Sequence, residues 1–239
     1  SIYLLYVEIK GIMREDLQMK IGPGGLIKLS FPMLIASSAI AISTNLDTLM
    51  LRYFESDAIV GNYNAALKLA MLLSFAITSI NALSAPQFSK LFHSGKIQEF
   101  RSSVQFTSKL ITIAALPILF AVGFFPGLFL SLFGDGFENA RLALQILCIG
   151  YFINAFCGPV DLLLQMVGKE KAFQWIIILS TVLNIVLNLI LIPVYGLNGA
   201  AIATTISISV WNLSSLIYVQ RKFGFWTNSL LGRSKPPKN

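Results

Sequence analysis

Six long apolar stretches alternate with short polar segments along this chain of 239 residues. A helix needs about 20 consecutive apolar residues to cross the hydrocarbon core of a bilayer, and each stretch is long enough to do so. The pattern therefore predicts an all-α, polytopic membrane protein with six transmembrane helices. The predicted spans are Leu26–Phe54, Ala58–Leu91, Ser108–Phe133, Leu142–Val167, Ala172–Val194 and Gly199–Val219.

The basic residues crowd into every second polar segment. Lys and Arg resist translocation and mark the cytoplasmic face, so this asymmetry predicts both the orientation and a chain with both termini in the cytoplasm. Only Arg52, Lys68 and Arg141 are left for the opposite side or the interior. The residues assigned to the cytoplasmic side are Lys10, Arg14, Lys20, Lys28, Lys90, Lys96, Arg101, Lys109, Lys169, Lys171, Arg221, Lys222, Arg233, Lys235 and Lys238.

The chain is predicted to have three parts. Residues 1–25 are interpreted as the end of a preceding span followed by a cytoplasmic linker, because the apolar run Ile2–Ile9 would extend only about 12 Å as a helix. Residues 26–223 form the six-helix lobe, and residues 224–239 form a basic cytoplasmic tail. This arrangement indicates the C-terminal part of a larger, transporter-like chain, located in the cytoplasmic (inner) membrane.

Composition excludes a soluble globular protein. Hydrophobic residues make up 55% of the chain and charged residues only 12%, about half of the usual share in soluble domains. The net charge of +7 is explained by topology and by anionic lipid headgroups, so nucleic acid is not an expected partner. The two cysteines, Cys148 and Cys157, fall on one predicted helix about 13 Å apart, and we expect them to pack as small apolar residues.

The sequence contains no motif for a common catalytic or cofactor site. No P-loop is present, because Gly95-Lys96 is followed by Ile97 and Gly168-Lys169 by Glu170. A single histidine, His93, cannot build a metal cluster or a Ser-His-Asp triad. We therefore expect no metal, no cofactor and no enzymatic activity.

Three ionisable residues, Asp47, Lys68 and Asp161, are predicted at membrane depth. Each costs at least about 2.5 kcal/mol on an insertion scale at a helix centre, so such residues are kept where they face a cavity, a partner or a pathway. A structural ion pair between Asp47 and Lys68 is the alternative for those two residues. Asp161 follows Pro159, where a bent helix leaves backbone groups that would satisfy its carboxylate.

A stripe of hydroxyl groups runs along the first predicted span. Ser30, Ser37, Thr44 and Thr48 recur at helical spacing, and Asn45 and Asp47 follow near the outer end. Such a stripe is badly placed against lipid, and the added polar residues favour water. Asn81, further along the second span, joins these candidates, whereas Asn184 and Asn188 on the fifth span are interpreted as contacts between helices.

A series of short motifs in a fixed order resembles one family of exporters. The motifs are Phe31-Pro32-Met33-Leu34, Asp47, Val60-Gly61-Asn62-Tyr63 with Ala66 and Lys68, Ala85-Pro86, Phe133-Gly134, Asn184 with Asn188, and Ile192-Pro193-Val194-Tyr195-Gly196-Leu197-Asn198-Gly199-Ala200-Ala201. Together they resemble the Wzx-type polysaccharide and O-antigen flippases, which belong to the multidrug, oligosaccharidyl-lipid and polysaccharide exporter superfamily. The resemblance extends from about Gly24 to Phe223.

This resemblance implies the C-terminal lobe of a two-lobe flippase, facing an N-terminal lobe across a cavity that opens alternately to each side. The implied substrate is an undecaprenyl-diphosphate-linked oligosaccharide, moved from the inner to the outer leaflet. Lys68 would neutralise the diphosphate, while Thr44, Asn45, Thr48 and the other hydroxyls would face the sugar. Asp47, also a candidate for substrate binding, or Asp161 would couple transport to an ion by changing protonation.

Several alternatives stay open at this point. A cation-coupled multidrug exporter and a lipid II flippase belong to the same superfamily, although a buried Lys68 is poorly suited to cationic ligands. A membrane enzyme acting on lipid-linked sugars would need an acid, base or metal at a membrane face, where the outer segments offer only Glu55, Asp57, Asp135 and Glu138. A scaffold that only packs against partners would not depend on Lys68.

Overall fold

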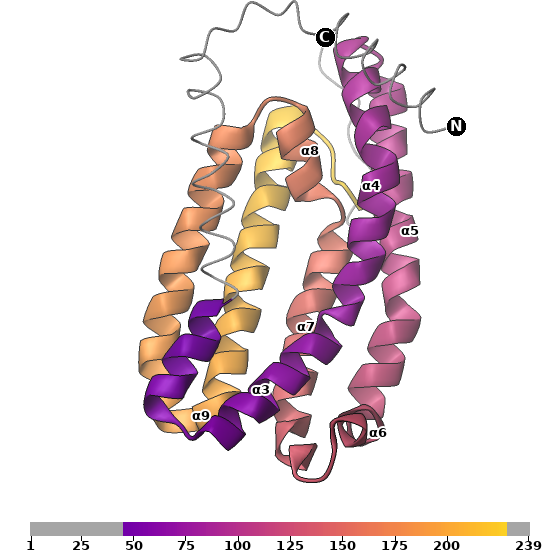
Figure 1. Cartoon of the computed structure of the whole chain (residues 1–239). Helices are drawn as coiled ribbons and strands as arrows, with labels where there is room; N and C mark the ends of the chain where they lie inside the picture. Colours follow the sequence, from indigo (N-terminus) through magenta and orange to yellow (C-terminus); the bar gives the residue numbers. More distant parts are fainter. Residues whose placement is uncertain (1–44, 229–239) are drawn as a thin grey trace, which may run out of the picture. The chain divides into compact units, whose positions relative to one another are not determined.

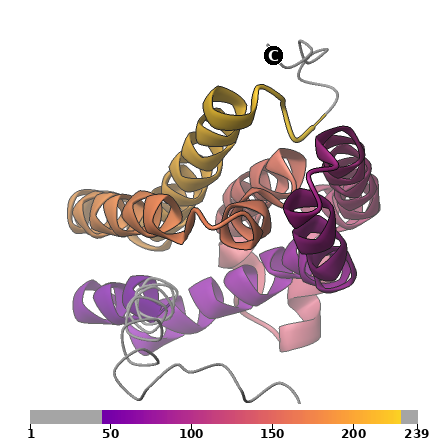
Figure 2. The same ribbon diagram turned by 90° about the horizontal axis from the view of Figure 1, so that it is seen from above.

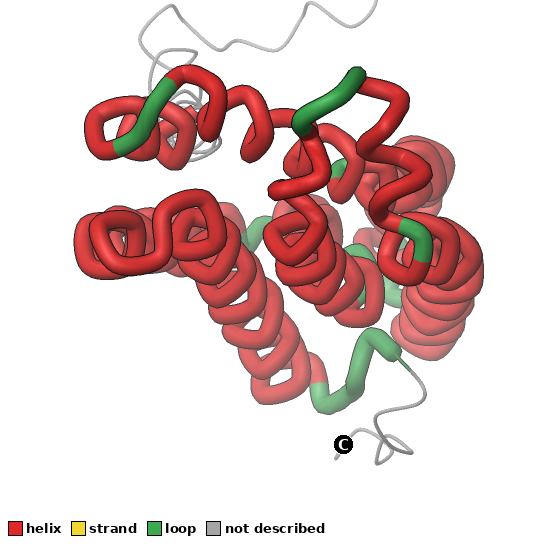
Figure 3. The backbone as a smooth tube through the Cα atoms, turned by 90° about the horizontal axis from the view of Figure 1, so that it is seen from below, coloured by secondary structure: helices red, strands yellow, loops and turns green. Residues whose placement is uncertain are grey.

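The computed structural model describes residues 45–228, which belong to the compact unit Ala39–Asn239. Within that range the chain is helical, with short loops and no strand (Figure 3). The all-α prediction is confirmed for this part of the protein. The predicted parts 1–25 and 229–239 lie outside the described residues, as does most of the first predicted span.

The second predicted span is one long helical segment with a break in the middle. The end of the first span, residues 45–54, is helical, and α3 (Asp57–Ala70) and α4 (Leu72–His93) follow. Met71 separates α3 from α4, and α3 runs obliquely to α4 (Figure 1). Because Pro86 lies inside α4, this helix continues through the proline, and the change of direction occurs at Met71 instead.

The third predicted span corresponds to α5 (Ile97–Phe124), which begins well before the predicted residue Ser108. A compact turn follows at the far end of the bundle and consists of three short helices: α6 (Pro126–Leu130), η2 (Ser131–Phe133) and η3 (Phe137–Ala140). Proline at the first position of α6 suits a helix start, because its missing N–H would have no helical acceptor there.

The fourth predicted span is interrupted at membrane depth. It forms α7 (Arg141–Cys157) and the shorter α8 (Val160–Met166), with Gly158 and Pro159 between them. Proline lacks the N–H that would continue the ladder of α7, and it disfavours helical geometry in the residue before it. The predicted kink at this pair is therefore confirmed.

The fifth and sixth predicted spans are the two arms of one element, α9 (Glu170–Phe223). A straight helix of 54 residues would be about 80 Å long, far more than a bilayer core of about 30 Å. The chain instead reverses at Gly196, whose φ of 54° is in the left-handed region (Figure 1). Gly199 lies directly against the backbone carbonyl of Leu191, so the predicted close packing at Gly199 is confirmed.

The arms and the neighbouring helices surround α7. Helix α7 contacts α9, α5 and α3, and it lies between α9 and α5 when the bundle is viewed along its axis (Figure 2). One apolar core joins α3 to α7 and α9, and its buried members include Leu51, Tyr63, Leu147 and Ile192. A second core, built around Phe88, Phe100 and Leu163 among others, lies toward the α8 end.

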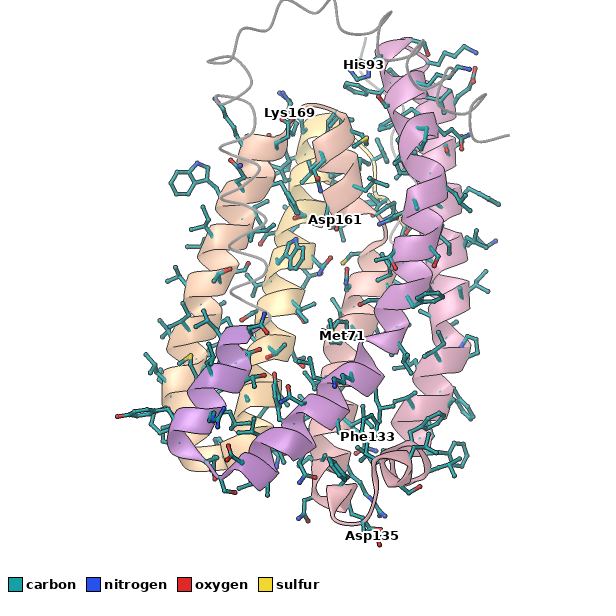
Figure 4. All side chains as sticks on the ribbon, in the orientation of Figure 1. Met71, His93, Phe133, Asp135, Asp161 and Lys169 are labelled. Atoms are coloured by element: carbon teal, nitrogen blue, oxygen red, sulfur yellow. The ribbon has the colours of Figure 1, made fainter. Side chains whose placement is uncertain are left out.

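Within the described residues, four helical segments are long and apolar enough to cross a membrane. They are Asp57–His93, Ile97–Phe124, Phe137–Cys157 and Glu170–Phe223. This number is smaller than the predicted six, because α9 contains two predicted spans and the first span is described only from residue 45. His93 and Lys169 lie at one end of the bundle, and Asp135 lies at the opposite end (Figure 4).

Residues 224–228, which the sequence places at the start of a basic tail, are packed into the bundle. Phe225 and Thr227 are buried, and Arg101 lies 5.9 Å from the centre of the Phe225 ring. The Thr227 hydroxyl donates a hydrogen bond of 2.6 Å to the carbonyl of Cys157, the last residue of α7. The Asn228 amide donates to the carbonyl of Phe156, so these two side chains satisfy carbonyls that the break after α7 leaves free.

Candidate functional site

The centre of the candidate site is the carboxylate of Asp47, which is only 3% exposed. The amide of Asn188 donates a hydrogen bond of 2.5 Å to Oδ1, and the hydroxyl of Thr204 donates one of 2.5 Å to Oδ2. The phenol of Tyr63 donates a third, of 3.2 Å, to Oδ2. All three partners are neutral, so a buried carboxylate is held here by hydrogen bonds alone.

The network continues behind these partners. The second hydrogen of the Asn188 amide reaches Oδ1 of Asn184 at 3.1 Å, and the hydroxyls of Tyr63 and Thr204 lie 3.0 Å apart. Asn184, Asn188 and Tyr63 are themselves buried. A buried polar network of this kind fixes the rotamers of its members, because each lost hydrogen bond leaves a donor or acceptor unsatisfied.

Helical spacing and the reversal at Gly196 explain how the network is assembled. Asn184 and Asn188 are four residues apart and share one face of the first arm of α9. Asn188 and Thr204 each lie about eight residues from Gly196, so both are at a height of roughly 12 Å above the turn. The two antiparallel arms therefore present an amide and a hydroxyl at one level, against Asp47.

A cavity of about 450 Å³ opens beside this network. Its wall is formed by residues 45–48, α3, the start of α4, α7 and both arms of α9. Hydroxyl and amide side chains alternate there with apolar ones. The polar and charged members are Asn45, Asp47, Thr48, Asn64, Lys68, Ser74, Tyr151, Asn154, Ser180, Thr181, Asn184, Thr204 and Ser207.

Lys68, in the last turn of α3, is the one cationic side chain among the described residues that line this cavity. The side chain is exposed. Lys68 is in none of the ion pairs of the described range, which are Arg52–Asp57 at 3.3 Å, Lys96–Glu99 at 3.0 Å and Arg141–Glu138 at 3.1 Å. The alternative of a structural ion pair between Asp47 and Lys68 is thus wrong for this structure.

A family model described as MatE matches residues 32–190, two thirds of the chain. The chain belongs to the MatE family. It is 27% identical over 172 residues to the probable flippase AglR of Haloferax volcanii, in an alignment that covers 70% of this chain and 36% of that protein. It is 28% identical over 151 residues to a putative O-antigen transporter of Shigella flexneri, covering 62% of this chain and 35% of the relative.

The fold agrees with the MatE assignment. A solved structure described as the outward-facing conformation of a multidrug resistance MATE family transporter of the MOP superfamily superimposes with a TM-score of 0.68 at 22% identity. The match covers 82% of this chain and 45% of that one. This chain therefore spans about a third to a half of the length of its MatE relatives. The resemblance found in the sequence is confirmed at the level of the family.

The structure of this MatE-family chain brings together four of the predicted site residues. Asn45, Asp47, Thr48 and Lys68 all line the cavity. Thr48 also donates a hydrogen bond of 3.1 Å to Asn64 of α3, so this part of the wall is cross-linked. Thr44 lies outside the described residues.

Two further candidates lie away from the cavity wall. Asn81, on α4, is partly buried, and its Oδ1 has no hydrogen-bond partner within residues 45–228. Asp161, near the start of α8, accepts a hydrogen bond of 2.8 Å from the N–H of Leu162. Its carboxylate is thereby satisfied locally by the backbone next to the helix break, which is the structural role anticipated for it.

The sequence did not reveal the partners of Asp47. The spacing of Asn184 and Asn188 was visible, but it suggested packing between helices, and nothing marked Tyr63 or Thr204 as part of a site. Thr204 is 157 residues from Asp47 along the chain. Only the reversal of α9 brings it within hydrogen-bonding distance, and the glycine at the reversal is the one sequence signal that points to it.

Proposed function

We propose that this chain is one six-span lobe of a two-lobe flippase that moves a diphosphate-linked oligosaccharide lipid across the cytoplasmic membrane by alternating access. The observation that carries the proposal is the presence of Lys68 and Asp47 on the wall of one polar cavity, without an ion pair between them. A cation and an acid kept apart at membrane depth are each free to serve a ligand.

In this proposal Lys68 provides the counter-charge for the diphosphate. The ammonium is exposed and needs no rearrangement of a salt bridge before it can bind an anion. A diphosphate that enters the cavity finds one cation there and amide or hydroxyl donors around it, for example Asn45, Thr48 and Asn64. Charge-assisted hydrogen bonds of this type are about twice as strong as neutral ones.

Asp47 is the proposed coupling group. A buried carboxylate without a cationic neighbour is costly, and this cost is relieved when it takes up a proton or a small cation. The oxygens of Asn184, Tyr63 and Thr204 surround it and suit a hard monovalent cation as well as a proton. Uptake and release at Asp47 would change the hydrogen bonds that hold the two arms of α9 to the rest of the lobe.

The charge distribution supports the proposed orientation. His93 and Lys169 lie at the same end of the bundle, where the basic segments gather, and Asp135 lies at the opposite end (Figure 4). We place the Lys169 end in the cytoplasm and the Asp135 end outside. A second, N-terminal lobe is the proposed partner, because the chain spans less than half of the length of its relatives.

The test is the surface polysaccharide of cells that depend on the transporter containing this chain. Lys68→Ala should abolish the polymer at the cell surface, while Lys68→Arg, which keeps the charge, should retain part of it. Protein levels in the membrane are compared by immunoblot. Normal polymer in the Lys68→Ala cells at equal protein level would refute the proposal.

A cation-coupled multidrug exporter is the second candidate, and the buried acid Asp47 is the observation that favours it. For cationic drugs Asp47 would bind the ligand and Lys68 would repel it. Lys68→Ala should then increase drug export, which is the opposite of its effect on a flippase. Efflux of a fluorescent cation such as ethidium, measured in the same cells, separates the two functions.

A further inference from the structure

Two hydrogen-bond donors at one end of the cavity have no partner. Trp211 and Ser180 both line the cavity, and the indole Nε1 of Trp211 and the hydroxyl of Ser180 are buried without a hydrogen bond among the described residues. Ser180 as a whole is 5% exposed. Buried donors are almost always paired in proteins, so two unpaired ones in the same wall point to a ligand.

The reversal of α9 places these two residues opposite each other. Each lies about 15 residues from Gly196, on different arms, and therefore roughly 23 Å above the turn. Asn188 and Thr204, which hold Asp47, lie about 11 Å closer to the turn. The Trp211 end is thus a separate level of the same cavity, nearer to the end of the bundle at which Lys169 lies (Figure 4).

Resting on the flippase function proposed above, we infer that Trp211 and Ser180 form the subsite that receives a sugar ring of the lipid-linked saccharide. The indole presents an apolar face on which the C–H groups of a pyranose pack, and Phe173, with its ring 6.1 Å from that of Trp211, supports the indole from the protein side. The N–H and the hydroxyl provide donors for ring-hydroxyl or acetamide oxygens.

Other parts of the substrate fit this position less well. A diphosphate carries charge, and the one cation that lines the cavity in the described chain is Lys68 on α3, on a different helix from Trp211 and Ser180. An acyl or prenyl chain has no acceptor for the two donors, and a cationic drug would bring more donors. A neutral ring with several oxygen acceptors satisfies both groups and keeps the aromatic face covered.

The subsite is tested by binding of two probes to the 239-residue protein in lipid nanodiscs. The probes are radiolabelled undecaprenyl diphosphate and undecaprenyl-diphosphate-N-acetylglucosamine, which differ only in the sugar. Trp211→Leu and Ser180→Ala should weaken binding of the sugar-bearing lipid about tenfold and leave the sugar-free lipid within about twofold. Trp211→Phe, which keeps a ring and removes only the N–H, should lie between these limits.

The control variant is Trp175→Leu, because Trp175 is also on α9 but 72% exposed, and it should change neither affinity. Equal weakening of both probes by Trp211→Leu, or no effect of either variant on the sugar-bearing lipid, would overturn the subsite. Lys68→Ala reports separately on the flippase proposal: it should weaken both probes, and unchanged binding of both would defeat that function whatever Trp211 shows.

Discussion

Asn188 donates a hydrogen bond of 2.5 Å to the carboxylate of Asp47, although 141 residues separate them along the chain. Asp47 belongs to the helix that precedes α3, and Asn188 to the first arm of α9. This contact ties the beginning of the described chain to its last hairpin at membrane depth. Removal of either side chain leaves the other buried without its partner, so the pair reports on both stability and mechanism.

We expect Asp47→Asn to stop transport without unfolding the protein. The amide has almost the same shape and keeps an oxygen for the Thr204 hydroxyl, but it neither takes up a proton nor attracts a cation. Transport in proteoliposomes should fall at least about tenfold while the melting temperature changes by only a few degrees. Asp57→Asn is the matched control, because Asp57 is 81% exposed and pairs with Arg52 at the surface. Full activity in Asp47→Asn would rule out a coupling role for this carboxylate.

Gly199→Ala should destabilise the hairpin of α9. A Cβ at this position would overlap the backbone carbonyl of Leu191, and backbone cannot move aside as a flexible side chain does. Overpacking of this kind costs about 1–3 kcal/mol. Gly61→Ala in α3 is the control, since nothing lies within 4 Å of its added methyl group, and alanine is the better helix former. Thermal unfolding in detergent should show a lower midpoint for Gly199→Ala only; equal midpoints would contradict the close approach of the two arms.

Thr227→Val should weaken the attachment of residues 224–228. The change keeps the side-chain volume but leaves the carbonyl of Cys157 without the hydroxyl that donates to it, a loss of about 1–3 kcal/mol. Thr78→Val on α4 removes a hydroxyl that bonds only within its own exposed helix turn, and it should change stability by no more than about 0.5 kcal/mol. The free energy of unfolding of both variants is compared in detergent. Identical values would mean that the segment does not hold the break after α7.

The proposed orientation is tested by cysteine labelling after Cys148 and Cys157 have been replaced by alanine. Cysteines at positions 57 and 135 should react with a membrane-impermeant maleimide in intact cells. Cysteines at positions 96 and 169 should react only after the membrane has been permeabilised. The reverse pattern would show that the basic segments do not face the cytoplasm.

Much of the fold could be predicted from the sequence because the bilayer imposes strong rules on it. Apolar runs have to be long enough to cross, and helix breaks follow glycine and proline, as at Gly158-Pro159 and at Gly196. The break at Met71 was not predictable in this way. Met71 has helical φ and ψ values and no breaking residue beside it, so the change from α3 to α4 depends on tertiary packing.

The candidate site was predictable only in part. The cost of burying charge at membrane depth was enough to single out Asp47 and Lys68. It did not distinguish a residue of the cavity from one satisfied by its own backbone, which is why Asp161 was selected together with them. The partners of Asp47 are ordinary polar residues, and their role arises from long-range contacts that no local pattern encodes.

The most direct test of the central claim is the rate at which a fluorescent, diphosphate-linked sugar lipid crosses proteoliposomes that contain this chain together with its partner lobe. If Lys68 holds the diphosphate in the cavity, Lys68→Ala should slow the crossing at least about tenfold, and Lys68→Arg should restore part of the rate. Lys90→Ala, which removes an exposed cation from the end of α4, should have no effect. An unchanged rate in Lys68→Ala at equal protein incorporation would contradict the account.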